Sequence, residues 1–438
     1  MTRRLLSFFS NRLIPGASYE TEYRLISSFS VEASLKRLLL HCSSNVPYYR
    51  RLLRDIGIID GTLVDLSRFA DIPIITKDII RSHEEELLST DYRTRRWYRN
   101  ASGGSTGEPI QLVQDDSYRR WGNCVSHYWY KDILGIDEVN AKKIVLWGSE
   151  RDLFQGTLGW SSKFINWLNN TTFLNSLKMT EGDMDRYLAA INACKPDLVR
   201  GYANSLYELC CYAERKGVTL HSPKAVVSSA EMLTDNMRAQ IETVFGTKVY
   251  NFYGSRETNN VAGECTKGFM HVFTFHNFVE ILDANNRPVR EGEEGRIIIT
   301  NLHNYSMPLI RYEIGDMAVR GPSLVTCGHP LPILERITGR TIDTFLREDG
   351  NLVPGEALAL AIYEEPWIKQ FQLVQEDYRK VRILLVLRDT LDQARQKEIE
   401  GKIRFLLGAD CEVLWDFVDE IPTTPQGKYR HIRCLIRR

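Results

Sequence analysis

The sequence lacks the features that most directly assign a function. No apolar run approaches the ~20 residues of a membrane-spanning helix. The 56 basic and 56 acidic side chains cancel, which argues against a nucleic acid or a membrane surface as the main partner. The nine cysteines include no CxxC pair, so we expect reduced thiols and a cytoplasmic location rather than disulfides.

Internal repeats and low-complexity segments are absent as well, and the composition is that of a globular protein. With 43% hydrophobic and 26% charged residues, a chain of 438 residues predicts two or three domains with a full core. The first residues are similar to a signal peptide, but Asn11 and Arg12 interrupt the apolar part. We expect a short amphipathic helix there instead.

The segment ASGGSTGEP, residues 101–109, concentrates three glycines and three hydroxyl residues. Such a loop turns tightly and brings backbone N–H groups close to a ligand, and phosphate suits that set of donors. The segment lacks the Gly-Lys-Ser/Thr ending of a Walker loop, so that mechanism is excluded. Taken alone, the segment is also compatible with a flexible connector.

Strands and helices alternate through the middle of the chain. Helical patterns cover residues 30–53, 115–134 and 234–245, and buried-strand patterns cover residues 141–147, 198–199, 224–227 and 248–252. This alternation predicts an α/β fold with parallel strands, in which ligands bind beyond the carboxyl ends of the strands. Residues 229–231 and 253–257 occupy such positions.

Two changes of character predict further units. Short strands separated by turn residues predict a β-rich subdomain over about residues 269–338. Beyond it, strand patterns and a charged helix near residues 391–407 predict a small α+β domain. The expected architecture is therefore α/β: a large N-terminal domain, residues 1–339, with mixed and parallel sheets flanked by helices, and a small mobile lid domain, residues 340–438.

Five separated segments share an order and spacing that one family explains. They are residues 102–109, YGSRE at 253–257, RYEIGD at 311–316, the group Gly339, Arg340 and Asp343, and PTTPQGK at 422–428. Together they resemble the core motifs of the adenylate-forming (acyl-activating) superfamily. The resemblance is to the phenylacetate–coenzyme A ligase branch, with its capsular-polysaccharide-associated relatives. The stretches VPYY at 46–49, IPIITK at 72–77 and PLIRY at 308–312 indicate the same branch.

The resemblance implies an enzyme that activates a small carboxylic acid with ATP, forming an acyl-adenylate and pyrophosphate. It implies that Glu257 coordinates Mg²⁺, that Tyr253 stacks near adenine and that Asp316 binds the ribose hydroxyls. It places Arg340 near the ribose and phosphate, and Lys428 between the carboxylate and the α-phosphate. The implied ATP-binding residues are Ser102, Gly103, Gly104, Ser105, Thr106, Gly107, Ser229, Ala230, Glu231, Tyr253, Gly254, Ser255, Asp316 and Arg340, and the implied catalytic residues are Lys428, Glu257 and Thr106.

Two positions depart from the superfamily pattern. Ile110 follows Pro109 where many members have a lysine, so the loop depends more on backbone and hydroxyl donors and on Mg²⁺. Ile342 stands where a hinge carboxylate is expected, two residues after the arginine. That substitution bears on the domain rotation that switches such enzymes from adenylation to thioester formation.

A zinc site is a separate hypothesis, because some relatives in this branch carry a Cys/His cluster beside the nucleotide domain. Cys265, His271 and Cys327 fall in similar places, with His329 close by. The pattern is incomplete, since Val325 stands where a Cys-x-Cys pair needs cysteine and a tetrahedral site needs about four ligands. Free buried thiols and ordinary turn histidines are the preferred interpretation, so Zn²⁺ is not an expected cofactor.

The acceptor of the acyl group stays open. The main expectation is an acid–thiol ligase that transfers the acyl group to coenzyme A or a carrier protein. An amine or hydroxyl acceptor is the alternative, and a nucleotide-binding relative that has lost turnover is a third. Residues near 147–149, 201–202 and 228–230 are candidates for the acid pocket, and a homodimer follows by analogy with the branch.

Overall fold

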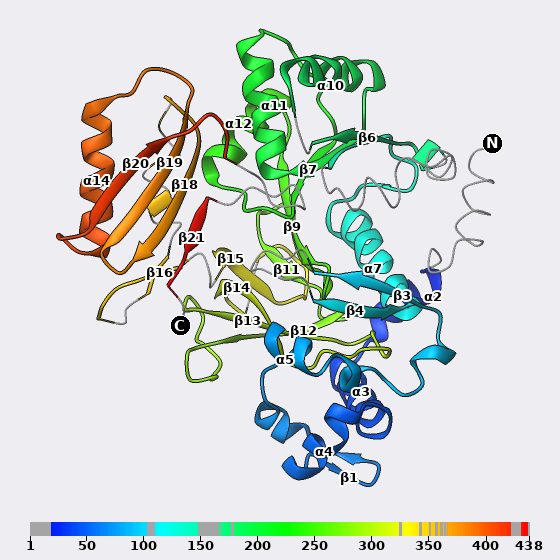
Figure 1. Cartoon of the computed structure of the whole chain (residues 1–438). Helices are drawn as coiled ribbons and strands as arrows, with labels where there is room; N and C mark the ends of the chain where they lie inside the picture. The colour runs from blue at the N-terminus through cyan, green and yellow to red at the C-terminus, as the bar shows by residue number, and fades with distance from the viewer. Residues whose placement is uncertain are drawn as a thin grey trace.

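An eleven-stranded sheet forms the centre of the molecule, which is described here from a computed structural model (Figure 1). The strand order is β12-β13-β14-β15-β11-β10-β9-β8-β7-β5-β6. The structure describes residues 19–102, 110–147, 166–167, 169–176, 179–323, 326–340, 344–349, 352–354, 358–359, 362, 365, 367–421 and 431–436.

One half of this sheet is parallel. Its strands are β5 (Lys143–Trp147), β6 (Thr171–Asn175), β7 (Leu198–Tyr202), β8 (Ala225–Ser229) and β9 (Val249–Ser255). The helices α10 (Glu181–Cys194), α11 (Ala203–Arg215) and α12 (Asp235–Phe245) cover one face through a continuous apolar core. Thr180 and Thr234 cap α10 and α12 by accepting a backbone N–H of the first turn, which fixes where these helices begin.

The other half is antiparallel. It consists of β10 (Asn259–Glu264), β11 (Met270–Val272), β12 (Asn277–Leu282), β13 (Glu294–Asn301), β14 (Tyr312–Arg320) and β15 (Ile333–Arg340). Pairing changes from parallel to antiparallel between β9 and β10, because β10 returns beside β9 through a tight turn. The β-rich segment thus continues the parallel sheet edge to edge.

A hairpin and a helix lie against the opposite face. The hairpin is β3 (Trp97–Ala101) and β4 (Gln111–Asp115), and α7 (Asp116–Tyr128) follows and continues into the π-helical turn η4 (Trp129–Ile133). Asp115 caps α7, and its second carboxylate oxygen accepts the N–H of Ser306 at 3.1 Å. Trp129 is fully buried and donates its indole N–H to the Glu264 carbonyl at 2.9 Å, which binds η4 to the sheet.

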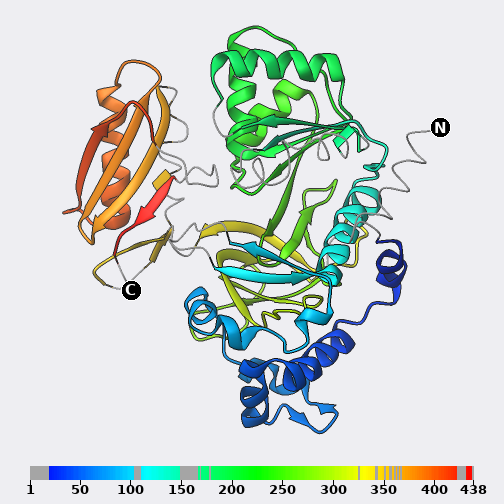
Figure 2. The same cartoon turned by 45° about the vertical axis from the view of Figure 1, so that its right-hand side comes forward.

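The N-terminal residues form short elements at the end of the molecule away from β20 and α14 (Figures 1 and 2). The expectation of one helix over residues 30–53 is wrong, because the helix ends at Asn45 and a second begins at Pro47. Proline lacks the N–H that a continuing helix requires, yet it suits the first position of a new one. The elements are α2 (Glu20–Leu25), η1 (Ile26–Ser28), α3 (Val31–Asn45), α4 (Pro47–Ile56), β1 (Ile59–Asp60), β2 (Leu63–Val64), η2 (Leu66–Asp71), α5 (Lys77–Ser82), α6 (Glu84–Leu87) and η3 (Tyr92–Thr94).

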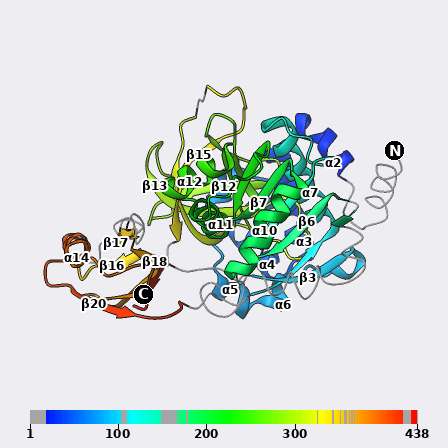
Figure 3. The same ribbon diagram turned by 90° about the horizontal axis from the view of Figure 1, so that it is seen from above.

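The C-terminal residues form a second sheet to one side of the first, as the view from above shows (Figure 3). Its order is β20-β19-β18-β21, with β18 (Ile368–Asp377), β19 (Lys380–Leu387), β20 (Glu412–Phe417) and β21 (Ile432–Cys434), and α14 (Gln393–Leu407) packs on it. The hairpin of β16 (Thr344–Leu346) and β17 (Leu352–Pro354) joins it through Gln375, whose amide donates to the Leu346 carbonyl at 2.7 Å.

The architecture agrees with the expected α/β class, with a small α+β unit at the C-terminal end. No helix in the described part of the chain combines the length and the apolar character needed to cross a bilayer. The short helix expected before Pro15 lies outside the described residues.

Candidate active site

Glu257 lies on the turn at which the large sheet changes from parallel to antiparallel pairing. The hydroxyl of Ser255 accepts the backbone N–H of Glu257 at 3.1 Å, so the turn is fixed from within. Gln114 on β4 and Tyr118 on α7 both donate to the Arg256 carbonyl, at 2.7 and 3.1 Å. The hairpin and α7 therefore hold the turn that carries Glu257.

The carboxylate of Glu257 is buried, and its described contacts are long. Glu257 is 8% exposed, and its Oε1 lies 3.5 Å from the Tyr312 hydroxyl and 4.0 Å from Lys77 Nζ. Buried carboxylates usually accept short hydrogen bonds, and none is found here among the described residues. A buried carboxylate with lone pairs to spare is a good ligand for a hard divalent cation, so Glu257 fits the Mg²⁺ role.

Lys77 is a site residue that the sequence analysis quoted only as part of a motif. Thr76 caps α5 and Lys77 is its first residue, with a side chain 16% exposed. Ile75, the residue before Thr76, pairs with the start of β14. It donates its N–H to the Arg311 carbonyl at 3.0 Å and accepts the N–H of Glu313 at 2.9 Å. A cation from the N-terminal segment thereby comes to lie against Glu257.

Arg311 anchors that segment. Its guanidinium is 2% exposed, donates to the Ile72 carbonyl at 2.7 Å and pairs with Glu280 at 3.1 Å. Arg311 also has a φ of 52°, in the left-handed region that non-glycine residues rarely adopt. The motif RYEIGD therefore contains a residue that anchors the segment carrying Lys77, as well as Asp316, the expected ribose ligand.

Tyr253 and Asp316 meet directly. The Tyr253 hydroxyl donates to Asp316 Oδ2 at 2.6 Å, although the two residues come from β9 and β14. Asp316 is also the register partner of Arg340 on β15. Gly315 and Gly339 precede these residues with φ values of 90° and 113°, which favour glycine. The structure thus brings Tyr253, Asp316 and the backbone of Arg340 together.

Residues 229–231 lie at the carboxyl end of β8, the strand that pairs with β9. Ser229 donates its hydroxyl to the Phe252 carbonyl at 2.9 Å, and Glu231 accepts the N–H and the side-chain amide of Asn204, both at 3.0 Å. Ala230 between them has a φ of 68°, a strained conformation for a residue with a Cβ. The expected position beyond the carboxyl ends of the strands holds for Ala230 and Glu231, whereas Ser229 is the last residue of β8 and Tyr253, Gly254 and Ser255 are the last three residues of β9.

The glycine loop joins the two strands of the β3–β4 hairpin. Ser102 closes its base: its N–H donates to the Ile110 carbonyl, and its hydroxyl accepts the Ile110 N–H, both at 3.0 Å. Ser102 is only 4% exposed, and its hydroxyl oxygen is used in closing the hairpin. Several expected residues lie outside the described part of the chain: Gly103, Gly104, Ser105, Thr106, Gly107, Ile342, Asp343 and Lys428.

The structure also brings together the three residues of the zinc hypothesis. The ligand atoms of Cys265, His271 and Cys327 all lie within 4.8 Å of one another, and Cys327 Sγ is 3.2 Å from His271 Nε2. His271 Nδ1 lies 3.1 Å from the Leu331 carbonyl, which directs Nε2 to the sulfurs, as in metal-binding histidines. The ring of His329 stands 5.4 Å from that of His271. This geometry supports the metal interpretation more than the sequence did.

We expect the purified protein to contain about one zinc ion per chain by mass spectrometry. Replacing Cys265 and Cys327 by serine is expected to remove it and to lower the melting temperature by about 5 °C, since the ion binds the folded state. Cys411→Ser, at a buried cysteine of the C-terminal sheet, is the matched control. Metal-free wild-type protein with an unchanged melting temperature would rule out the site.

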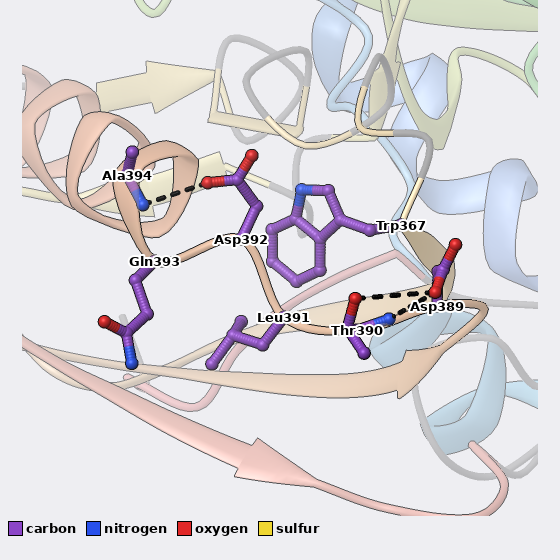
Figure 4. Close-up of a pocket in the computed structure, with 7 residues that line it drawn as sticks. All are labelled: Trp367, Asp389, Thr390, Leu391, Asp392, Gln393 and Ala394. Atoms are coloured by element: carbon purple, nitrogen blue, oxygen red, sulfur yellow. Dashed lines mark hydrogen bonds between the residues drawn. The ribbon is translucent and has the colours of Figure 1, made fainter.

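A cavity of about 700 Å³ lies beside the C-terminal sheet, at the segment between β19 and α14 (Figure 4). It is lined by Trp367, Asp389, Thr390, Leu391, Asp392, Gln393 and Ala394. The carboxylate of Asp392 already accepts the N–H groups of Ala394 and Arg395 at the start of α14. That helix end is thus satisfied and offers no anion site.

Comparison with known proteins agrees with this geometry. Residues 345–434 match the family described as the CapK C-terminal domain. The chain is 23% identical to the protein CapK of Staphylococcus aureus over 407 residues, covering 89% of this chain and 85% of that one. It is 28% identical to phenylacetate–coenzyme A ligase of Thermus thermophilus over 407 residues, covering 89% and 84%.

A solved structure shows the same fold. It is 2-hydroxyisobutyryl-CoA ligase in the postadenylation state in complex with 2-HIB-AMP, with a TM-score of 0.73, 18% identity, and coverage of 93% of this chain and 89% of that one. The same enzyme in its thioesterification state gives a lower TM-score of 0.60. This chain therefore superposes better on the postadenylation structure than on the thioesterification structure.

The chain has the fold of a CoA ligase and is similar over most of its length to CapK and to phenylacetate–coenzyme A ligases. These similarities support the adenylate-forming superfamily and, within it, the phenylacetate–coenzyme A ligase branch.

Proposed function

We propose that this chain activates a carboxylic acid with ATP to an acyl-adenylate, with release of pyrophosphate, and then transfers the acyl group to a thiol. The observation that carries the proposal is the convergence of Glu257, Tyr253 and Asp316, which come from the β9–β10 turn, β9 and β14. The ligases among its relatives support the same chemistry.

Each residue has a defined task in this proposal. Asp316, held by the Tyr253 hydroxyl, accepts hydrogen bonds from the ribose, and the Tyr253 ring lies against adenine. Glu257 holds Mg²⁺, which supplies positive charge to the phosphate oxygens when bound. Because attack by a carboxylate on phosphorus brings two anions together, most of the catalysis is positioning and charge compensation.

Lys77 supplies charge that the glycine loop lacks. Ile110 is buried in the position that follows Pro109, so no cation of the hairpin can take the place of the usual lysine there. Lys77 Nζ, 4.0 Å from Glu257, approaches the same region from α5. We propose that it compensates the triphosphate charge from the opposite side of the site.

Lys77→Met is expected to raise the KM for ATP and to slow ATP–pyrophosphate exchange by about tenfold to a hundredfold, since one charged contact is lost. Steady-state exchange at varied ATP concentration measures both quantities. Lys36→Met is the matched control, because Lys36 also pairs with a glutamate, at 2.6 Å, on the exposed face of α3. Equal rates in the two variants would exclude a role for Lys77 in ATP binding.

We propose further that residues 340–438 act as a lid that carries Lys428 to the site. The similarity to the postadenylation state of a ligase supports an arrangement suited to the first half-reaction. Thioester formation in such enzymes requires rotation of the lid, and Ile342 is the departure that bears on it. The acceptor of the acyl group is therefore a thiol in the main proposal, and an amine is the alternative.

The test has two stages. ATP–pyrophosphate exchange is measured over a panel of aromatic and aliphatic acids, and absence of exchange with every acid, in folded protein that binds ATP, overturns the proposal. The product is then identified by mass spectrometry with coenzyme A, a carrier protein and amines offered together. A thioester supports the thiol acceptor, an amide supports the alternative, and a retained adenylate excludes both.

A further inference from the structure

Arg200 is a half-buried cation at the carboxyl-end region of the parallel sheet. It lies on β7, one residue before Gly201, and its register partners are Val145 on β5 and Val227 on β8. Residues near 147–149, 201–202 and 228–230 are the candidates for the acid pocket. Arg200 therefore lies on β7 directly before the residues that are candidates for the acid pocket.

Aromatic rings hold its guanidinium in place. The guanidinium carbon lies 5.6 Å from the ring centroid of Trp147, at the end of β5, and 5.5 Å from that of Phe252, in the middle of β9. The rings of Trp147 and Tyr202 are themselves packed at 4.3 Å. Cation–π contacts fix the position and plane of an arginine but leave its charge uncompensated.

The guanidinium has no carboxylate partner in the part of the chain that the structure describes. Among the described residues no carboxylate forms an ion pair with Arg200, and its Nε is buried without a hydrogen-bond acceptor. Arg311, the arginine that is fully buried among the described residues, is by contrast paired with Glu280 at 3.1 Å. Buried charges are normally neutralised by a partner, so the arrangement at Arg200 is half of an ion pair.

We propose that the acid activated by this chain carries a second carboxylate, which Arg200 binds at the far end of the acyl pocket. This inference rests on the proposed function. The fork of a guanidinium matches a carboxylate with two parallel hydrogen bonds, and its charge does not depend on pH. The aromatic walls of Trp147 and Phe252 suit the carbon chain or ring between the two carboxylates. One carboxylate is adenylated while the other stays ionised against Arg200.

The inference is tested with matched pairs of acids in ATP–pyrophosphate exchange. Glutarate is compared with pentanoate, and terephthalate with 4-methylbenzoate, so that each pair differs in the second carboxylate. We expect the wild-type protein to prefer one of the dicarboxylates by roughly 10- to 100-fold in kcat/KM, the size of a charged hydrogen-bonded pair. Arg200→Met should abolish that preference through KM, and Arg200→Lys should restore part of it.

Two further measurements separate the possible outcomes. Calorimetric binding of the dicarboxylate to wild-type and Arg200→Met protein reports the contact without turnover, and the dissociation constant of ATP should be the same in both. Exchange with monocarboxylic acids but with no dicarboxylate overturns this inference and leaves the proposed function intact. An unchanged preference for the dicarboxylate in Arg200→Met does the same. Absence of exchange with every acid overturns the proposed function itself.

Discussion

Glu257→Gln is expected to slow ATP–pyrophosphate exchange by about 10²- to 10³-fold, the loss that follows removal of one charge-stabilising group. Glu257 is 8% exposed, and its carboxylate makes only long contacts within the described part of the chain, to Tyr312 and Lys77, so the substitution breaks no short hydrogen bond there. The amide keeps the shape of the side chain but loses the charge that attracts Mg²⁺. We therefore expect the Mg²⁺ concentration for half-maximal rate to rise in parallel.

The matched control is Glu294→Gln, an exposed carboxylate on β13 of the same sheet. Its rate and Mg²⁺ dependence should equal those of the wild-type protein, and both variants should unfold at similar temperatures. If Glu257→Gln lost stability but kept its Mg²⁺ dependence, the side chain would be a structural carboxylate and the metal assignment would be wrong.

Lys428→Ala is expected to slow adenylate formation by about 10²- to 10³-fold, because the proposed role is to neutralise charge between the carboxylate and the α-phosphate. Transfer of the acyl group from a chemically supplied acyl-adenylate should be much less affected, since that charge no longer forms. Single-turnover measurements of the two half-reactions separate these effects.

Lys402→Ala is the control for the lid. Lys402 lies on α14 and forms an exposed pair with Glu398 at 3.0 Å, so its loss should change neither half-reaction. An unchanged first half-reaction in Lys428→Ala would show that the assignment of this lysine is wrong, whatever the acceptor proves to be.

Helices and strands could be predicted where a capping residue or an apolar run marks them in the local sequence. Thr234 before an apolar period predicts α12, and the runs at residues 141–147 and 224–227 predict the buried strands β5 and β8. The break between α3 and α4 was missed, since the apolar period continues through Val46 and only Pro47 interrupts it. Sheet continuity was also beyond the sequence, because β11 pairs with β15, a strand that lies far along the chain.

The site was predicted in its parts and not in its contacts. The motifs supplied Tyr253, Glu257 and Asp316 as candidates. The carboxyl end of β9 explains where Tyr253 and Glu257 lie, whereas Asp316 is in the middle of β14 and meets Tyr253 through a long-range contact. Lys77 was not predicted as a partner of Glu257, since 180 residues separate them (257 − 77). The three-residue Cys/His group was undervalued for a similar reason: spacing alone could not show that His271 points at Cys327.

The attachment of α5 to β14 has a consequence for fragments of this protein. Every strand of the eleven-stranded sheet begins at Lys143 or later, so a fragment that starts after Ser82 would retain the whole sheet together with Tyr253, Glu257 and Asp316. It would nevertheless lose Lys77 and the Ile75–Tyr312 bridge that delivers it. Intact secondary structure in such a fragment would therefore be no guide to its competence: the catalytic unit is wider than the sheet that carries its motifs.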